Sequence, residues 1–384
     1  MTSSVNTPRT ICLVTSYAGS VIGFRGELIS SLVCSGTKVF VLAPNHSDST
    51  RSGIVSLGAF PHSYPLNRSG FNPISDIRAF FFLYQFFKKH RVDSVLTYFV
   101  KPNIWGMLAA SFARVPIRVA LVEGLGLAFS PSYCIQDFLF KFLIASVVKV
   151  LYAFSLRFSK SVVVLNSADR KMLVKCCGIS PRKIQVLGGI GIDLSKWRYS
   201  LPQVNPFTFI FIGRLIREKG ILEYLRAAEL VKKVFPDVRF LVVGALDYSQ
   251  KGLVYSSLVS AVNSGAVEWI GSVKGEDVAS WLDKSSVFVL PSYYREGVPR
   301  SSQEAMAIGR PIITTNLPGC RDTVIDGANG IYVPHLDHIA LSTAMQYFIR
   351  NPQLVVKMGA VSRLIAERSF DVFKKNAILI ALLQ

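Results

Sequence analysis

Short apolar runs of strand length alternate along the chain with longer stretches in which apolar residues recur at helical spacing. In the first half, the strand-like runs are residues 11–16, 38–43, 94–98, 118–122 and 161–165. Helical patterns follow most of them, near residues 26–34, 74–89, 103–112 and 167–176. Alternation of this kind predicts a doubly wound parallel sheet with helices on both faces.

A second series begins after a connection rich in glycine and proline, residues 188–206. Its strand-like runs are residues 207–212, 239–243, 267–270, 287–290 and 311–314, and helical patterns lie near residues 220–234 and 253–263. The predicted fold class is therefore α/β, with two doubly wound, Rossmann-like domains facing across a cleft. We expect the domains to span residues 1–188 and 189–368, followed by a terminal apolar helix within 369–384.

Two glutamates, Glu296 and Glu304, lie eight positions apart in a segment that follows the buried-looking run 287–290. The first glutamate precedes a glycine, and the second opens an apolar helical stretch. In an open α/β sheet this order places both carboxylates at the carboxyl edge of a strand, where ligands bind. Carboxylates accept hydrogen bonds from sugar hydroxyls, and free N–H groups at a helix start bind phosphate, which together suit a nucleotide sugar. The spacing alone is equally compatible with a solvated Glu296 and a helix-capping Glu304.

The segment 209–220, FIFIGRLIREKG, places cations directly after a predicted strand. The strand ends at Gly213, and Arg214 and Lys219 follow before the next helix. An arginine and a lysine at a strand end can clamp a diphosphate, although two surface cations would give the same pattern.

Backbone N–H groups that could donate hydrogen bonds to phosphate are expected at two further places. After Glu296, Pro299 has no N–H, so the expected donors are the residues around it: Gly297, Val298 and Arg300. The loop 16–25 carries Gly19 and Gly23 before a helix, which fits either a phosphate-binding glycine loop or an ordinary strand–helix turn.

The residues around Glu296 and Glu304, EGVPRSSQEAMAIGRPIITT, resemble the Glu-x7-Glu signature of glycosyltransferase family 4, whose members are retaining enzymes of the two-domain GT-B architecture. The segment 209–220 is similar to the donor-phosphate motif of that family. The resemblance implies that Arg214 and Lys219 neutralise the leaving nucleoside diphosphate. It also implies that Glu304 binds the ribose hydroxyls and Glu296 the sugar hydroxyls near the anomeric centre. Further, it implies that Gly19 and Gly23 approach the diphosphate and that the terminal helix returns to the first domain.

Three segments of the first half, residues 68–73, 98–106 and 123–129, narrow the resemblance. They resemble enzymes that add N-acetylhexosamine or a related sugar to an undecaprenyl-diphosphate-linked sugar in bacterial surface polysaccharide synthesis. The acceptor-binding residues that it implies are Arg68, Asn72, Lys101, Glu123, Gly124 and Gly126. Many family members carry a histidine after the fourth strand, whereas residues 119–126 contain none and Glu123 occupies the loop. This glutamate is expected either to contact the acceptor sugar or to cap its own loop, and both interpretations stay open.

The amino-acid composition bears on whether the protein holds a metal, a cofactor or disulfides. The chain has 384 residues, of which 50% are hydrophobic and 17% charged, as in globular proteins. The six cysteines form no CxxC pair, which favours a reducing compartment over a disulfide framework or a zinc site. The five histidines are scattered and no Asp-x-Asp occurs, so we expect no metal and no cofactor in the active site.

Net charge is +19 and uneven, since residues 1–190 carry 21 Lys and Arg against 7 Asp and Glu, and residues 191–384 carry 22 against 17. A basic half implies an anionic partner. The chain has no nucleic-acid-binding motif, so nucleic acid is not expected as the partner, and an anionic membrane surface is favoured.

A predicted amphipathic helix, 133–160, has its cations on one arc of its surface: Lys141, Lys149, Arg157 and Lys160. The alternative is a helix packed on its own sheet with a solvated basic edge.

A second apolar-basic segment, 80–89, adds to this membrane interpretation. We expect no signal peptide and no spanning helix, and therefore a peripheral protein on the cytoplasmic face of the inner membrane. The predicted function is retaining, metal-independent transfer of a sugar, an N-acetylhexosamine, from a UDP-sugar to an undecaprenyl-diphosphate-linked sugar. The alternatives are a GT-B-fold sugar-nucleotide epimerase and a non-catalytic polyanion- or lipid-binding protein.

Overall fold

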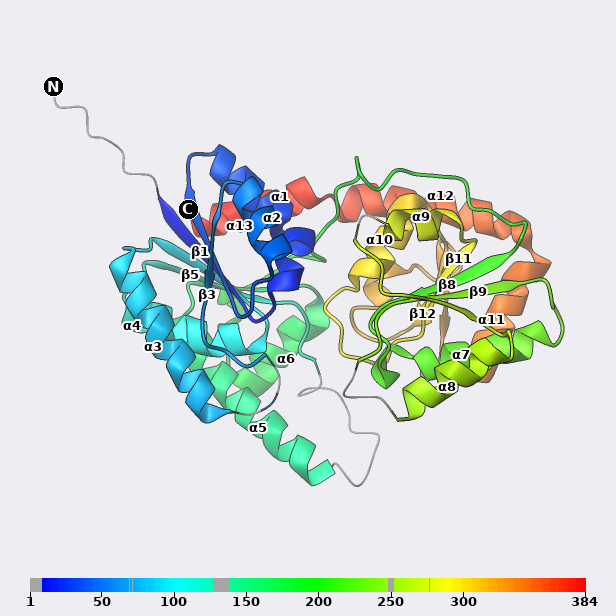
Figure 1. Ribbon diagram of the computed structural model, residues 1–384, viewed down its shortest axis with the longest axis horizontal. Coiled ribbons are helices and arrows are strands. Elements are labelled where there is room, and N and C mark those ends of the chain that lie inside the picture. The colour runs from blue at the N-terminus through cyan, green and yellow to red at the C-terminus, as the bar shows by residue number, and fades with distance from the viewer. Residues whose placement is uncertain (1–8, 69, 71, 127–137, 248–251, 276) are drawn as a thin grey trace. The chain divides into compact units, whose positions relative to one another are not determined.

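The computed structural model describes residues 9–384 except 69, 71, 127–137, 248–251 and 276. The chain divides into two compact units, and each is built on a parallel sheet (Figure 1). Unit 1 comprises residues 1–187 and 373–384, and unit 2 comprises residues 188–372. The predicted α/β class with two Rossmann-like domains is confirmed.

Unit 1 has a seven-stranded sheet in the order β3-β2-β1-β4-β5-β6-β7. Its strands are β1 (Thr10–Thr15), β2 (Lys38–Ala43), β3 (Phe60–Ser63), β4 (Ser94–Tyr98), β5 (Ile117–Val122), β6 (Ser161–Val164) and β7 (Ile184–Val186). Its helices are α1 (Val21–Cys34), α2 (Asp48–Ser56), α3 (Pro73–Lys89), α4 (Met107–Phe112), α5 (Phe138–Ser155), α6 (Ser167–Cys177) and α13 (Val372–Leu383). The order of strands reverses between β1 and β4, which makes this the topological switch point of the sheet.

The last helix packs against the amino-terminal sheet although it follows unit 2 in the chain. The Ser94 hydroxyl at the start of β4 donates to the Leu383 carbonyl oxygen at 2.6 Å. The Lys375 ammonium donates to the Leu187 carbonyl oxygen at 2.5 Å. These contacts hold α13 as part of unit 1.

Unit 2 has a six-stranded sheet in the order β10-β9-β8-β11-β12-β13. Its strands are β8 (Thr208–Ile212), β9 (Arg239–Val243), β10 (Glu268–Gly271), β11 (Val287–Leu290), β12 (Ile312–Thr315) and β13 (Gly330–Val333). Its helices are α7 (Ile221–Lys232), α8 (Leu253–Asn263), α9 (Val278–Asp283), α10 (Arg300–Ile308), α11 (His338–Arg350) and α12 (Pro352–Ser369). Strands β8 and β11 pair directly, with Phe209 opposite Val287, and the switch point lies between them.

Two predicted helices have different bounds in the structure. Helix α1 begins at Val21 rather than near residue 26, so Gly23 lies inside the helix and not in the preceding loop. Helix α5 ends at Ser155, and a separate 3-10 turn, Leu156–Phe158, follows it. Lys160 therefore lies outside the helix, and the prediction of one continuous basic arc to residue 160 is wrong at this end. Residues 133–137 of that prediction lie outside the described residues.

The exposed apolar side chains described for α5 form a stripe. Leu143 is 62% exposed and Val150 67%, and Val147 and Phe154 are also exposed. These four residues are spaced by four, three and four positions, so they form one stripe along the helix. Among the described residues, no helix is both long enough and apolar enough to span a membrane.

Candidate functional site

Two loops meet at the switch point of the unit 2 sheet. Because β8 and β11 are paired neighbours in a parallel sheet, the segment 213–220 after β8 and the segment 291–299 after β11 emerge side by side at its carboxyl edge. These loops carry most of the residues that the sequence predicts for the donor, so the sheet itself brings them together.

Lys219 and Glu296 form an ion pair between the two loops. Their Nζ and Oε1 atoms are 2.5 Å apart, and the side chains are 13% and 11% exposed. The Ser292 hydroxyl donates to the same carboxylate oxygen at 3.1 Å. A cation and a carboxylate, each still reachable from solvent, thus share one position.

A glycine allows the two loops to approach this closely. Gly220 follows Lys219 with φ of +77°, and a Cβ there would lie 2.2 Å from the Pro291 carbonyl oxygen. Any other residue would push the turn that carries Lys219 away from the loop that carries Glu296. The predicted phosphate-binding segment therefore depends on its final glycine for its shape.

Arg214 lies in the same loop as Lys219 and is open to solvent. It is 51% exposed, and its Nη1 atom lies 3.8 Å from Oδ2 of Asp247. It also acts on Tyr294: burial and the Glu296 carboxylate raise the pKa of the Tyr294 phenol, and Arg214 opposes the shift. Ser292, Tyr294 and Asp247 are not singled out by sequence reasoning, because single polar residues in loops have no spacing that would reveal them.

Glu304 is buried in the second turn of α10 and pairs with Arg300. The Arg300 Nε atom donates to Oε1 of Glu304 at 2.7 Å, and Glu304 is 8% exposed. Burial raises the pKa of the Glu304 carboxyl, and Arg300 partly offsets the shift. The helix begins at Arg300 rather than at Glu304, so the expectation that Glu304 opens it is wrong. Arg300 thus offers its side chain to Glu304 in addition to its predicted backbone N–H.

The backbone around Glu296 packs closely against the loop that follows β12. Gly319, after β12, has φ of +85°, and a Cβ there would lie 2.5 Å from the Gly297 carbonyl oxygen. Glu296, Gly297, Val298 and Pro299 are all buried. The predicted donors after Glu296 are therefore held in one conformation.

The predicted residues of unit 1 form two separate groups. In the first, the Arg68 guanidinium lies 3.9 Å from the centroid of the Tyr17 ring, and this ring also packs against Gly19. Gly23 is exposed in the first turn of α1. The structure thus brings Arg68 and Gly19 together through Tyr17.

The second group lies at the start of α3. The Asn72 side chain caps this helix by accepting from the Ser75 N–H at 3.1 Å. Lys101 forms an ion pair of 2.9 Å with Asp76, which is 4% exposed. Asn72 and Lys101 therefore both stabilise this segment, whatever else they bind.

Glu123 lies directly after β5 and forms an ion pair with Arg25 of α1. The glycines that follow have positive φ, +122° at Gly124 and +65° at Gly126. An isolated arginine in a largely apolar helix gave no sequence signal for Arg25. Glu123 therefore does more than cap its own loop, since its carboxylate contacts a residue of helix α1.

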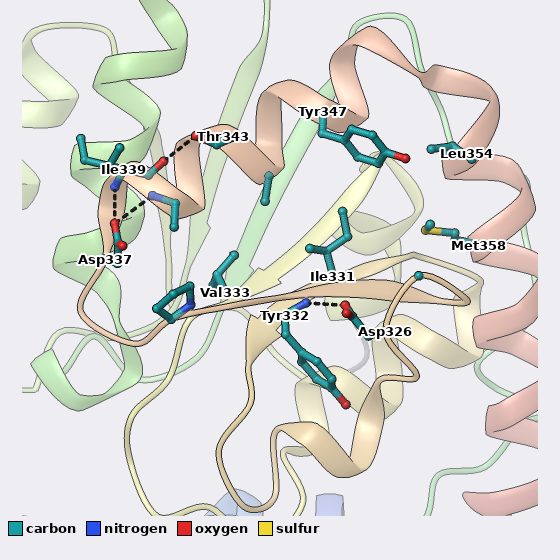
Figure 2. Close-up of a pocket in the computed structure, with 14 residues that line it drawn as sticks. Asp326, Ile331, Tyr332, Val333, Asp337, Ile339, Thr343, Tyr347, Leu354 and Met358 are labelled. Atoms are coloured by element: carbon teal, nitrogen blue, oxygen red, sulfur yellow. Dashed lines mark hydrogen bonds between the residues drawn. The ribbon is translucent and has the colours of Figure 1, made fainter.

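A cavity of about 810 Å³ lies elsewhere in unit 2, between β13, α11 and α12 (Figure 2). Tyr332 donates its N–H to Asp326 there, and Asp337 caps α11 by accepting from Ile339 and Ala340. None of the predicted donor or acceptor residues lines it. In the described part of the chain, no three His, Cys, Asp or Glu side chains are grouped so that they could hold a metal ion.

Residues 196–364 match the family model described as Glycosyl transferases group 1. The N,N'-diacetylbacillosaminyl-diphospho-undecaprenol α-1,3-N-acetylgalactosaminyltransferase of Campylobacter jejuni is 28% identical to this chain over 359 residues, which cover 90% of each protein. The capsular polysaccharide biosynthesis glycosyltransferase CapM of Staphylococcus aureus is 25% identical over 322 residues, 81% of each. The solved structure of HepE from Anabaena in complex with UDP and glucose superposes with a TM-score of 0.77 at 17% identity, covering 98% of this chain and 99% of that one. This last likeness shows a shared fold.

Proposed function

The chain carries a glycosyl transferases group 1 domain over residues 196–364, and from this premise we propose that it transfers a sugar, an N-acetylhexosamine, from a UDP-sugar to a sugar on undecaprenyl diphosphate. The protein is a glycosyltransferase, which sets aside a non-catalytic polyanion- or lipid-binding role. The acceptor class is that in the name of the Campylobacter relative, and a role in surface polysaccharide synthesis is supported by the name of CapM. The reaction retains the anomeric configuration and needs no metal.

The observation that carries the donor assignment is the Lys219–Glu296 pair beside Arg214 at the switch point of the unit 2 sheet. A diphosphate binds Lys219 and the exposed Arg214, because a compact ammonium and a forked guanidinium both match phosphate oxygens. This frees Glu296 to accept hydrogen bonds from sugar hydroxyls. Glu304, held by Arg300, accepts from the ribose hydroxyls.

The chemical step is a displacement on one face of the donor sugar. The bond from the anomeric carbon to the diphosphate oxygen breaks, the acceptor oxygen bonds to that carbon, and the acceptor proton passes to the departing diphosphate. Negative charge grows on the diphosphate as its bond breaks, so Lys219 and Arg214 bind the transition state more strongly than the ground state. Glu296 is not the nucleophile in this proposal, since its carboxylate accepts hydrogen bonds from Ser292 and from the donor-sugar hydroxyls.

Unit 1 binds the acceptor and the membrane in this proposal. The exposed stripe of α5, Leu143, Val147, Val150 and Phe154, is followed by the exposed cations Arg157 and Lys160. Helix α3 repeats the arrangement: Ile74, Ile77 and Phe81 are exposed, and Lys88 and Lys89 follow at its end. Figure 1 shows α3 and α5 on the same side of the unit 1 sheet.

An apolar stripe with cations at its end suits shallow insertion into an anionic bilayer. The acceptor lipid stays in that bilayer, so we place the protein at the cytoplasmic face of the inner membrane as a peripheral protein. Of the two lysines predicted on α5, Lys149 is half-buried and the side chain of Lys141 lies outside the described residues, so we assign the main contact to the apolar stripe.

UDP release with and without acceptor tests the function. The protein is incubated with each of several UDP-sugars, alone and with an undecaprenyl-diphosphate-linked sugar. We expect release of UDP only when donor and acceptor are both present. Conversion of a UDP-sugar without acceptor would support the epimerase alternative and contradict transfer.

Vesicle flotation tests the membrane contact. The triple variant Val147→Gln, Val150→Gln and Phe154→Gln should float poorly with anionic vesicles, whereas turnover of a short-chain, water-soluble acceptor should persist. The matched control replaces three equally exposed apolar residues of unit 2 by glutamine: Val234, Leu253 and Leu364. If the triple variant floats like the control, lipid contact lies elsewhere than α5.

A further inference from the structure

Three buried polar side chains from three elements of unit 1 meet at the carboxyl end of its sheet. Arg25 comes from α1 and is 1% exposed, and Tyr98 is the last residue of β4 and is fully buried. Glu123 follows β5, and its side chain is 8% exposed. No predicted role uses Arg25 or the phenol of Tyr98.

The contacts fix the Arg25 guanidinium from three sides. Its Nη2 atom pairs with Oε1 of Glu123, and its Nη1 atom donates to the Phe24 carbonyl oxygen at 2.9 Å. Its central carbon lies 5.1 Å from the centroid of the Tyr98 ring, a cation–π contact. Among the described residues, Nε of Arg25 has no hydrogen-bond partner, and the Tyr98 hydroxyl lies beside the hydroxyls of Thr15 and Ser20.

Stability alone does not account for this group. A buried ion pair is commonly no more stabilising than a well-packed apolar pair, because both charges lose their hydration. The buried Nε–H of Arg25, which lacks a partner among the described residues, makes the group less favourable still. Groups that weaken a fold in this way are concentrated where a protein binds or orients a ligand.

The position in the sheet supports such a role. Strands β1 and β4 are the neighbours between which the strand order reverses, and β5 adjoins β4. Ligands of open α/β sheets bind outside the carboxyl ends of strands at such a point. The backbone there is unusual: Phe99, directly after Tyr98, has φ of +71°, and Gly124, directly after Glu123, has φ of +122°.

We infer that Arg25 is a positioning residue for the acceptor: it holds the Glu123 carboxylate, and with it the segment 123–126, in the orientation that accepts a hydrogen bond from an acceptor-sugar hydroxyl. Tyr98 supports the guanidinium from below through its ring. Glu123 takes no proton, since the acceptor proton passes to the departing diphosphate. This inference rests on the proposed function and adds to it the residue that orients the acceptor side.

The experiment compares variants in steady-state transfer from a UDP-sugar to the lipid-linked acceptor. Arg25→Gln should raise the acceptor KM or lower kcat by at least about tenfold, the effect of losing one oriented, charged hydrogen bond. The Kd for UDP should stay within about twofold, because the charged residues assigned to UDP, Arg214, Lys219 and Glu304, lie in unit 2. Arg25→Lys keeps the positive charge but loses the forked geometry of the guanidinium. Its acceptor KM and kcat should lie between those of the wild type and those of Arg25→Gln.

A paired variant separates positioning from folding. Arg25→Gln leaves Glu123 buried without its cation, so we add Arg25→Met with Glu123→Leu, which removes both charges and packs the site. This double variant should unfold at the wild-type temperature or above, bind UDP normally and still lose acceptor turnover. The matched control, Arg239→Met with Glu268→Leu, removes an exposed ion pair of unit 2 and should transfer normally.

Two results would overturn the inference. A folded double variant with wild-type kcat and acceptor KM would make the pair purely structural. Loss of UDP affinity in that variant would mean that the change acts on unit 2 instead. A wild-type protein without any transfer activity would contradict the proposed function itself, before any variant is compared.

Discussion

The ion pairs Lys219–Glu296 and Arg25–Glu123 occupy the same place in their sheets but differ in how far water reaches them. Each lies at the carboxyl edge of a parallel sheet, close to the switch point. The side chains of Lys219 and Glu296 are 13% and 11% exposed, and Arg214 beside them is half-exposed. Arg25 is 1% exposed. Lys219 can therefore leave Glu296 and bind an incoming phosphate. The buried Arg25 can act on a ligand only through the carboxylate of Glu123.

The largest expected effect is on stability, in unit 1. Arg25→Gln should lower the free energy of unfolding by about 3–5 kcal/mol, because it leaves a buried carboxylate without its cation. Arg239→Gln removes an ion pair whose side chains are 40% and 49% exposed, and should cost about 1 kcal/mol or less. Urea denaturation of both variants measures the difference. Equal losses would mean that burial does not distinguish these pairs.

The next effect is on turnover, in unit 2. Lys219→Ala should lower kcat by about 10²–10³-fold, because its charge stabilises the diphosphate most as the sugar bond breaks. Arg214→Ala should do less, since water screens its exposed guanidinium. Lys233, exposed beyond the end of α7, provides the control as Lys233→Ala. Wild-type kcat in both active-site variants would refute the diphosphate clamp.

Glu304→Ala should weaken UDP binding by about 10- to 150-fold, because ribose hydrogen bonds to a charged acceptor contribute about 1.5–3 kcal/mol each. Glu229→Ala, an exposed position on α7, should leave UDP affinity unchanged. Isothermal titration with UDP measures both. An unaltered Kd for Glu304→Ala would show that another residue binds the ribose.

The smallest effect depends on pH and concerns unit 1. Burial lowers the pKa of His46, His62 and His90, and the cations Arg51, Lys89 and Lys38 lower it further. As pH falls below about 6.5, the unfolded chain takes up protons before the folded one does, so stability is full above that pH and declines below it. Thermal unfolding between pH 7.5 and 5.5 should show this decline, and the triple His→Gln variant should flatten it. An identical slope in that variant would assign the decline to other groups.

The sequence predicts the sheets well where a strand is a central, continuous apolar run. The predicted ranges for β2, β4, β9 and β11 coincide with the strands of the structure, because buried parallel strands carry apolar residues on both faces. The strands β3, β7 and β13 escape prediction. They are edge strands of three or four residues. Polar residues or proline interrupt β3 and β7, and the apolar run of β13 is only three residues long.

The site is predictable to the extent that its residues stand in spaced motifs. Arg214, Lys219, Glu296 and Glu304 are found in this way, but their partners are not. The pairing of Lys219 with Glu296 joins two loops through the adjacency of β8 and β11, which spacing along the chain does not express. Arg25 likewise becomes visible only when α1 is folded against the end of β5.

Transfer of a radiolabelled sugar, followed by NMR of the product linkage, tests the central claim most directly. Radiolabelled UDP-sugars are supplied in turn with an undecaprenyl-diphosphate-linked acceptor, with EDTA present throughout. We expect that one donor yields a lipid-linked product whose new bond keeps the anomeric configuration of the donor. A product of inverted configuration, or no product with any UDP-sugar and acceptor tried, would contradict it.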